Sequence, residues 1–446
     1  MTTPHSASDQ INRCDWFGQP RGLTILFLTE MWSQFSFFGM RALLVLYATK
    51  HLKFAQADAS WIYGLYAAAV YITPVFGGII SDRWIGRRKA VMIGGLIMAV
   101  GHIAMAFENL FLFALATIAL GNGLFLPGLP AQIDDLYASD DPRRKSAYSV
   151  YYIGINVGAF AAPLVIGTVG ELYGFHWGFG LAAIGMFIGM TVYAAGGRYL
   201  PREVTRRSAV TKQRDCSSLL STMRGLASQF ALLAGIAATI VVFRGAYEQI
   251  GNTMTLWADG SVDRSLGGGL TIPVTWFLAL NSLIVICLSP LLIRYWTRLA
   301  KRGREPTTIA KMVTGALLVS IAFFVLAAVA STANGTGVSW IWLALFIILL
   351  TIGELYILPV GVGLFARLAP AGLAATTIAL WYSAGFFGNL FAGWLGTLWH
   401  VLGTGLFFAS TGVIACTAAA LLFAFDGAVR KREAANFATT AQPLAT

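Results

Sequence analysis

Residues 77–89 read GGIISDRWIGRRK and separate two apolar runs, at about 58–80 and 88–107. Each run has about 20 residues, the length that an α-helix needs to cross the hydrocarbon core of a bilayer. Residues 83–89, at the break and the start of the second run, hold four Lys or Arg. Such an excess is typical of short loops on the cytoplasmic side of a membrane. This stretch therefore predicts two membrane-spanning helices joined by a short cytoplasmic loop.

Apolar runs of this kind recur along the whole chain. They fall at about 23–49, 58–80, 88–107, 109–136, 145–170, 176–196, 227–257, 270–299, 307–331, 336–367, 372–397 and 402–425. Of the 446 residues, 57% are hydrophobic and only 11% are charged, whereas soluble domains carry about 25% charged residues. The sequence predicts an all-α polytopic membrane protein with twelve transmembrane helices. It excludes a soluble enzyme, a collagenous or disordered chain and a single-span receptor.

The formal net charge of +11 is unevenly distributed. With the amino terminus in the cytoplasm, 26 of the 31 Lys and Arg fall on the cytoplasmic side, while the opposite side keeps Lys50, Lys53 and Arg264. This is the asymmetry that orients membrane proteins. We therefore expect both termini in the cytoplasm and the lipid bilayer as the surroundings. We expect no nucleic-acid partner and no cleaved signal peptide.

One long polar stretch, at about 197–226, divides the chain into two halves of six spans. The expected order is a cytoplasmic tail at 1–22, a six-helix bundle at 23–196, the cytoplasmic linker at 197–226, a second six-helix bundle at 227–425 and a cytoplasmic tail at 426–446. The halves echo one another, because Tyr152 and Gly158 have the same spacing in the fifth span as Tyr382 and Gly388 in the eleventh. Two similar bundles favour alternating access around a midplane site. Small residues at this spacing also serve ordinary helix packing.

Five charged residues fall well inside the predicted spans, where desolvation makes a charge costly and a functional role the default interpretation. They are Glu30 and Arg41 in the first span, Arg244 and Glu248 in the seventh, and Glu354 in the tenth. Arg244 and Glu248 are one helical turn apart and can pair with each other. The alternative interpretation is that these residues form internal ion pairs that stabilise a single conformation.

The first span has one polar and aromatic face. Glu30 and Arg41 are close to three helical turns apart, and Gln34, Phe37 and Phe38 lie on the same side. We expect this face to line a water-filled cavity. Elsewhere in the chain no nucleophile and base, phosphate-binding glycine loop or metal-ligand spacing stands out. The sequence therefore predicts no enzymatic activity, no cofactor and no bound metal.

Residues 77–89 resemble the signature of the loop between the second and third helices in the major facilitator superfamily. The resemblance implies a gating latch at Asp82, Arg83, Arg87 and Arg88. Narrower matches run in order from about residue 30 to 397. They are YYIGINVG at 151–158, AYEQ at 246–249, WF at 276–277 with Asn281, GEL at 353–355, and Trp381 with GN at 388–389. On these motifs the chain is identified as a member of the proton-dependent oligopeptide transporter family.

The chain also departs from that family's pattern. Members usually open with E-x-x-E-R-F-x-Y-Y-G-x-R, and residues 30–41 here read EMWSQFSFFGMR. Leu126 replaces a usual Lys, and Arg244 stands at a customary Trp. The linker, about 30 residues long, is too short for the two extra helices that many bacterial members carry. The resemblance thus implies the major facilitator fold, with twelve helices in two bundles of six and no extra helix pair.

The residues and the resemblance together predict the site. Expected substrate contacts are Gln34, Phe37, Phe38, Arg41, Tyr71, Asn156, Arg244, Glu248, Asn281, Glu354 and Trp381, and expected proton carriers are Glu30, Glu248 and Glu354. The resemblance implies that Arg41 and Glu248 pair as a gate when the extracellular side is closed. Asn156, Asn281 and Glu354 match residues that hold the amino terminus of a peptide.

The function implied is a monomeric secondary transporter in a bacterial-type inner (plasma) membrane. It would carry small peptides or peptide-like solutes by alternating access, as a proton symporter with a non-standard set of coupling residues. Two alternatives stay open. The first is a transporter, or an exporter, of another amine-bearing or neutral metabolite or drug, and the second is a receptor on the same fold that does not transport.

Overall fold

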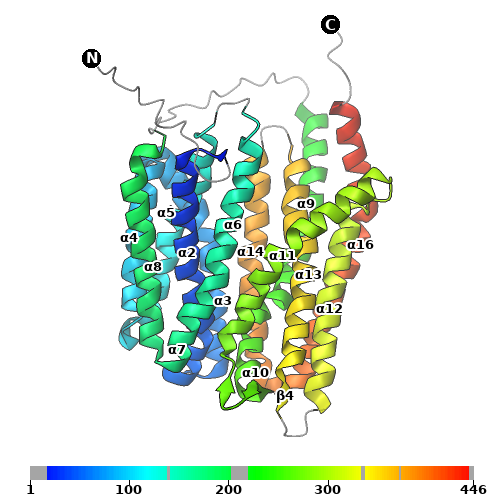
Figure 1. The fold of residues 1–446 in the computed structure, drawn as a ribbon. Helices are drawn as coiled ribbons and strands as arrows, with labels where there is room; N and C mark the ends of the chain where they lie inside the picture. Colours follow the sequence, from blue (N-terminus) through cyan, green and yellow to red (C-terminus); the bar gives the residue numbers. More distant parts are fainter. Residues whose placement is uncertain (1–17, 138–140, 202–218, 333–336, 371–372, 441–446) are drawn as a thin grey trace, which may run out of the picture. The chain divides into compact units, whose positions relative to one another are not determined.

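The computed structural model describes residues 18–137, 141–201, 219–332, 337–370 and 373–440. Within these ranges, twelve long helices follow one another along the chain (Figure 1). They are α2 (Arg21–Leu46), α3 (Gln56–Ile80), α4 (Arg87–Ala104), α5 (Phe111–Asp134), α6 (Arg144–Ala162), α8 (Phe175–Ala195), α9 (Leu219–Tyr247), α11 (Val274–Lys301), α12 (Thr308–Thr332), α13 (Trp340–Arg367), α14 (Ala374–Thr397) and α16 (Thr404–Thr440). The predicted all-α fold is confirmed.

Nine of these helices, counted among the described residues, are long and apolar enough to cross a membrane. The other three are α2, α4 and α14. Helix α2 carries Glu30 and Arg41 within its length, and α4 opens on the cations of residues 87–89. Charges lower the mean hydropathy of a helix without shortening it. Polar spans of this kind are tolerated where they face protein or a water-filled cavity.

Short elements interrupt or connect the long helices where the sequence predicts continuous spans or loops. They are the π-helical turns η2 (Tyr47–His51), η3 (Ser81–Ile85) and η5 (Pro163–Gly167), the 3-10 turns η4 (Glu108–Leu110), η6 (Gly196–Tyr199) and η8 (Glu248–Gly251), and the helices α7 (Thr168–Leu172), α10 (Thr253–Ser261) and α15 (Trp399–Leu402). Strand β1 (Val262–Asp263) pairs in parallel with β4 (Val338–Ser339), and β2 (Ser265–Gly267) forms a hairpin with β3 (Leu270–Thr271).

Several helices differ from the predicted spans. The span expected at 145–170 changes to a π-helical turn at Pro163, because proline has no N–H for the helical ladder. The span expected at 227–257 breaks at Glu248, and Asn252, with φ −114° and ψ −103°, separates its last two pieces. Helix α9 begins at Leu219, inside the segment expected to be linker, and α16 runs past residue 425 to Thr440. Residues 202–218 of the linker lie outside the described residues.

The chain packs as two compact units. Unit 1 comprises residues 1–54, 69–209 and 265–286, and unit 2 comprises residues 55–68, 210–264 and 287–446. Helices α3 and α11 each contribute one part to each unit.

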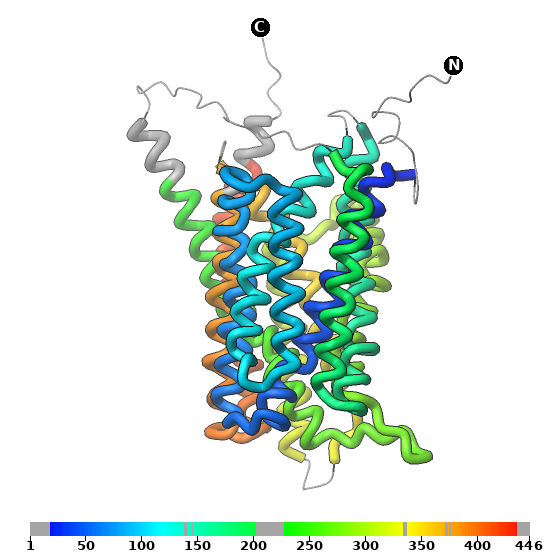
Figure 2. The backbone as a smooth tube through the Cα atoms, turned by 90° about the vertical axis from the view of Figure 1, so that its left-hand side faces the viewer, coloured from blue at the N-terminus to red at the C-terminus, as the bar shows by residue number. Residues whose placement is uncertain are grey.

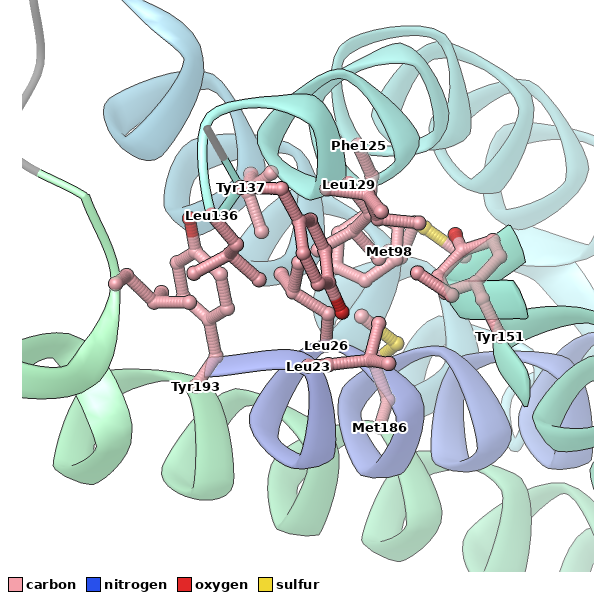
Figure 3. Close-up of a cluster of buried hydrophobic side chains, with 14 of the residues drawn as sticks. Leu23, Leu26, Met98, Phe125, Leu129, Leu136, Tyr137, Tyr151, Met186 and Tyr193 are labelled. Carbon is pink, nitrogen blue, oxygen red and sulfur yellow. The ribbon is translucent and has the colours of Figure 1, made fainter. Parts of the chain in front are cut away.

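In unit 1, α2 packs against α6 and α8, and α4 packs against α5; the dark-blue start of α2 runs beside the green α8 in Figure 2. Side chains from these five helices meet in one buried cluster, in which Figure 3 labels Leu23, Leu26, Met98, Phe125, Leu129, Leu136, Tyr137, Tyr151, Met186 and Tyr193. Among its polar atoms, the Tyr193 hydroxyl donates to Gln132 Oε1 over 2.9 Å. A Cβ at Gly158 would lie 2.2 Å from the Met31 carbonyl oxygen, so only glycine lets α6 approach α2 this closely.

In unit 2, α12 packs against α13 and α16, and α9 packs against α14 and α16. Phe323 and Phe346 meet edge to face in its core, with ring centroids 4.9 Å apart. A Cβ at Gly315 would lie 2.5 Å from the carbonyl oxygen of Gly353. Glycine at this position therefore lets the backbones of α12 and α13 lie in contact. Small residues at such crossings are typical of helix association in membranes.

Candidate functional site

The polar face predicted on α2 exists in unit 1. Glu30 is fully buried, and Gln34 Nε2 donates to its Oε1 over 2.7 Å. Phe37 and Phe38 contact each other edge to face, with centroids 5.4 Å apart. Both rings, Gln34 and Arg41 are half-buried. The face therefore anchors its carboxylate internally through a neutral amide and leaves an amide, two rings and a guanidinium partly accessible.

Three further predicted residues of unit 1 come from other helices. Asn156, on α6, is 8% exposed, and its Nδ2 donates to the carbonyl of Tyr152 one turn earlier over 2.9 Å. Tyr71 on α3 and Asn281 on α11 are half-buried. This bond uses only an N–H of the Asn156 amide. The amide oxygen takes no part in it.

In unit 2, Arg244 and Glu248 form a buried ion pair on α9 and η8. Arg244 Nη1 lies 2.8 Å from Glu248 Oε1, and the two side chains are 6% and 3% exposed. The pairing predicted from their one-turn spacing is confirmed. Gly388 on α14 makes room for the aliphatic part of the Arg244 side chain, since a Cβ there would lie 2.5 Å from Arg244 Cβ. The neighbouring Gln249 Nε2 donates to the Ala392 carbonyl over 2.9 Å and ties the same two helices together.

Glu354 and Trp381 lie on α13 and α14 of unit 2. Glu354 is half-buried in the middle of its helix. Trp381 is 6% exposed and packs edge to face on Phe365, with centroids 5.2 Å apart. A Cβ at Gly361 would lie 2.3 Å from the Trp381 ring. Most of the Trp381 surface is thus occupied by helix packing within its own unit.

The predicted latch residues of unit 1 lie in η3 and at the start of α4. Arg87 Nε lies 3.4 Å from Asp82 Oδ1, and Arg87 Nη1 lies 3.0 Å from Asp135 Oδ2 beyond the end of α5. Arg88 Nη2 donates to the Gly197 carbonyl over 2.8 Å, and Arg83 is exposed. The contact between Arg87 and Asp82 was predictable from the loop sequence. The contact between Arg87 and Asp135 was not, because Asp135 lies 48 residues farther along the chain.

Among the described residues, polar contacts join the first half of the sequence to the second in at least two places, and neither was predicted. In the Glu171 clamp of unit 1, the Glu171 carboxylate accepts from Val274 N over 2.9 Å, from Thr275 N over 2.8 Å and from Thr275 Oγ1 over 2.7 Å. Trp276 Nε1 adds a 2.7 Å bond to Thr168 Oγ1. Glu171 lies one residue beyond the predicted fifth span, and no local pattern links it to the start of α11.

The second set, the Ser60 cluster, lies in unit 2. Ser60 Oγ donates to Asn252 Oδ1 over 2.8 Å. Gln56 Nε2 donates to Ser60 Oγ over 2.6 Å and to the Gly396 carbonyl over 2.9 Å. One turn along, a Cβ at Gly64 would lie 2.4 Å from Gly393 Cα, so α3 and α14 cross there without side chains between them.

The sequence model of the POT family (PTR2) matches residues 88–233 and 228–402. The chain belongs to the POT family. It is 30% identical to the uncharacterized transporter YclF of Bacillus subtilis, over 93% of this chain and 95% of that one. It is 32% identical to the peptide transporter YePEPT of Yersinia enterocolitica, over 85% of this chain and 88% of that one.

Solved structures agree with this assignment. A peptide transporter POT crystallised with sulfate superposes with a TM-score of 0.85 at 28% identity, covering 96% of this chain and 99% of that one. A second structure of a POT peptide transporter, a mutant in complex with alafosfalin, gives a TM-score of 0.83 at 29% identity, over 96% of this chain and 99% of that one. The predicted family and the major facilitator fold are confirmed. This POT-family protein is a multi-pass membrane transporter and not an enzyme.

Proposed function

We propose that this POT-family protein is a secondary transporter of small peptides or peptide-like solutes, driven by protons through alternating access. Its relatives support the substrate class, since YePEPT and the Lactococcus lactis di-/tripeptide transporter, 29% identical over 90% of this chain, are named for peptides. The observation that carries the proposal is family membership over most of the chain. We place the protein as a monomer in a bacterial-type inner membrane with both termini in the cytoplasm.

Contacts between the sequence halves support alternating access. The Glu171 clamp and the Ser60 cluster join helix ends that the proposed topology puts on the outer side. Both consist of hydrogen bonds and small residues rather than an interlocked apolar core. Bonds of this type contribute about 0.5–1.5 kcal/mol each, or about 1.5–3 kcal/mol where one group is charged. They are therefore strong enough to hold one state and weak enough to be broken in each transport cycle.

The charges in the spans point to the chemistry of the substrate. The predicted spans hold three carboxylates, those of Glu30, Glu248 and Glu354, and two guanidinium groups, those of Arg41 and Arg244, so these five residues carry one net negative charge. Where the family pattern has an arginine and a lysine, this chain has Gln34 and Leu126. We infer that this transporter favours a solute with an ammonium group and an uncharged or apolar far end, because an anionic group would be desolvated beside carboxylates.

Binding of Ala-Ala and of its C-terminal amide to the purified protein tests this inference. We expect the amide to bind at least as tightly as the free acid, measured by calorimetry and by the rise in melting temperature on ligand binding. Tenfold tighter binding of the free acid, about 1.4 kcal/mol, would contradict it. If Arg244→Gln or Arg41→Gln then abolished that preference, the guanidinium that holds the carboxylate would be identified.

Proton coupling is tested at the missing lysine. We propose that Glu354 carries protons and that its behaviour depends on Leu126 being uncharged. Leu126→Lys should change the pH dependence of peptide uptake into liposomes, and Glu354→Gln should flatten it. An unchanged profile in both variants would refute this role. The proposed gate between Arg41 and Glu248 is tested separately, since the double swap Arg41→Glu with Glu248→Arg should recover more uptake than either single change.

A second candidate is a transporter of another amine-bearing or neutral metabolite. The replacements at Gln34 and Leu126 favour it, because they remove both cations that would hold a peptide carboxylate. A counterflow panel of peptides, peptide amides, amino acids and sugars distinguishes the two. Exchange with a non-peptide amine but with no peptide or amide would select the second candidate.

A further inference from the structure

Three side chains with metal-ligating atoms meet in unit 1, outside every residue set assigned above. His51 is the last residue of η2, Glu108 opens η4, and His176 is the second residue of α8. His51 Nε2 lies 2.7 Å from Glu108 Oε1, and His176 Nε2 lies 3.2 Å from His51 Nε2. The three ligating atoms all lie within 4.8 Å of one another.

Hydrogen bonds between these groups do not satisfy the geometry. A ring nitrogen carries at most one hydrogen. If His51 Nε2 donates its one hydrogen to Glu108, that hydrogen is not directed at His176, and the two Nε2 atoms have no hydrogen of their own between them. If His176 Nε2 donates to His51 instead, the His51 nitrogen points a lone pair at a carboxylate oxygen 2.7 Å away. When both ring hydrogens sit on Nδ1, all three atoms present lone pairs to one place, where a single cation would interact favourably with all of them.

Aromatic packing fixes the rings in this arrangement. Tyr47, which is fully buried, stacks on His51 with centroids 5.2 Å apart and an interplanar angle of 16°. The same ring meets His176 edge to face at 6.0 Å, and Phe175 meets His51 at 6.0 Å. Ligands held in place before binding lose little conformational entropy when an ion arrives.

We propose that His51, Glu108 and His176 bind a divalent first-row metal ion, with Zn²⁺ as the preferred ion. Two imidazoles and one carboxylate are a donor set that zinc accepts, and three protein ligands leave a fourth position for water. Ligands of a tetrahedral zinc ion lie about 3.3 Å apart, given metal–ligand bonds of about 2.0–2.1 Å. The two histidine nitrogens already have nearly this separation. Glu108 Oε1 lies closer than this to His51 Nε2, at 2.7 Å, and the Glu108 side chain is 58% exposed, so its carboxylate has room to move to a ligating position.

Such an ion would join three helix ends of unit 1. His51 follows α2, Glu108 precedes α5, and His176 belongs to the first turn of α8. With the proposed topology all three lie on the outer side, where the exposed Glu108 gives the ion access. An ion bound only by the folded unit raises its stability by mass action. The site does not depend on what the protein transports, and it would exist even if the proposed substrate class were wrong.

Zinc titration of the full-length protein tests the proposal. The protein is purified without a histidine tag and stripped with a chelator, and His5, which lies outside the described residues, is replaced by Ala in every sample. We expect one Zn²⁺ per chain by calorimetry, a zinc-dependent rise in melting temperature, and visible d–d absorption on binding Co²⁺. His51→Ala and His176→Ala should each weaken binding by about tenfold or more, and Glu108→Gln should weaken it less.

The matched control is His400→Ala, which removes an exposed imidazole on α15, outside the cluster. It should keep the wild-type affinity. Because Glu108 is exposed, Glu108→Gln preserves the fold and carries the test even if a histidine variant aggregates. The proposal is overturned if the wild-type protein shows neither heat nor stabilisation with millimolar Zn²⁺. It is equally overturned if the histidine variants and Glu108→Gln bind zinc as tightly as the wild type.

Discussion

Replacing Glu171 should release the start of α11 from α7. The Glu171 carboxylate accepts two backbone N–H bonds, from Val274 and Thr275, and one hydroxyl bond from Thr275. The first N–H groups of a helix have no partner within the helix, and the helix dipole makes a negative charge favourable there. Glu171 therefore acts as an N-cap for α11 that comes from another helix.

The magnitude follows from these contacts. Loss of an N-cap costs about 0.5–2 kcal/mol, and loss of a charge at a helix N-terminus costs about 0.3–1 kcal/mol. Glu171 is half-buried, so solvent replaces part of what is lost. We expect about 2 kcal/mol for Glu171→Ala, which shifts the equilibrium between the formed and the broken clamp by about 30-fold. Glu171→Gln keeps an acceptor but loses the charge, so about half of that free energy should remain. Thr275→Val loses only the hydroxyl bond and should have the smallest effect.

Distances between spin labels at Tyr173 and Leu270 measure the clamp. Both side chains are exposed, at 74% and 68%, and both belong to unit 1. The four native cysteines are first replaced by Ser. The population with the longer distance should grow in the order wild type, Thr275→Val, Glu171→Gln, Glu171→Ala. A folded, monodisperse Glu171→Ala protein with the wild-type distance distribution would refute the reasoning.

Three smaller predictions concern packing and pH. Gly64→Leu should prevent the backbone crossing at Gly393 and sharply reduce the yield of folded protein in detergent, whereas a normal yield and melting temperature would contradict the observed contact. Tyr137→Phe leaves the buried Gln19 Oε1 without its 2.7 Å donor and should lower stability by about 1 kcal/mol, read as a fall in melting temperature. Burial also raises the pKa of Tyr137 to about 12. The stability that the neutral Tyr137 hydroxyl contributes is therefore present below about pH 10 and is lost between about pH 10 and 12. The melting temperatures of the wild type and Tyr137→Phe should converge over that range. Asp82→Asn removes an exposed 3.4 Å contact and should change stability by less than about 0.5 kcal/mol.

The fold could be predicted from local properties of the sequence. Length and hydropathy of each apolar run are enough to place a membrane helix, and all twelve long helices coincide with predicted runs. The breaks inside those runs depend on contacts that hydropathy does not record. Glu248 was expected inside a continuous span, but it opens a 3-10 turn in a segment where Asn252 bonds to Ser60, a residue 192 positions away.

The same division holds for the candidate site. Arg244 and Glu248 are one helical turn apart, so their pairing was predictable and is confirmed. The Glu171 clamp joins residues more than 100 positions apart, and His51 is 125 positions from His176. No period or motif connects such residues, so only the folded chain brings them together. The Arg41–Glu248 gate stays a prediction.

Two of the departures from the family pattern that affect charge, at Gln34 and Arg244, have a common physical logic. A buried carboxylate needs a partner, and Glu30 has one in the neutral amide of Gln34 instead of a guanidinium. A buried guanidinium needs a partner as well, and Arg244 has Glu248 at 2.8 Å and the space left by Gly388. The cation missing from α2 is thus matched by a cation on α9, each with local partners. Breaking a buried pair by removing one member costs about 3–5 kcal/mol, so Glu248 cannot be neutralised without a cost at Arg244. Glu248→Gln should therefore cost more stability than the exposed Asp82→Asn, read as a larger fall in melting temperature.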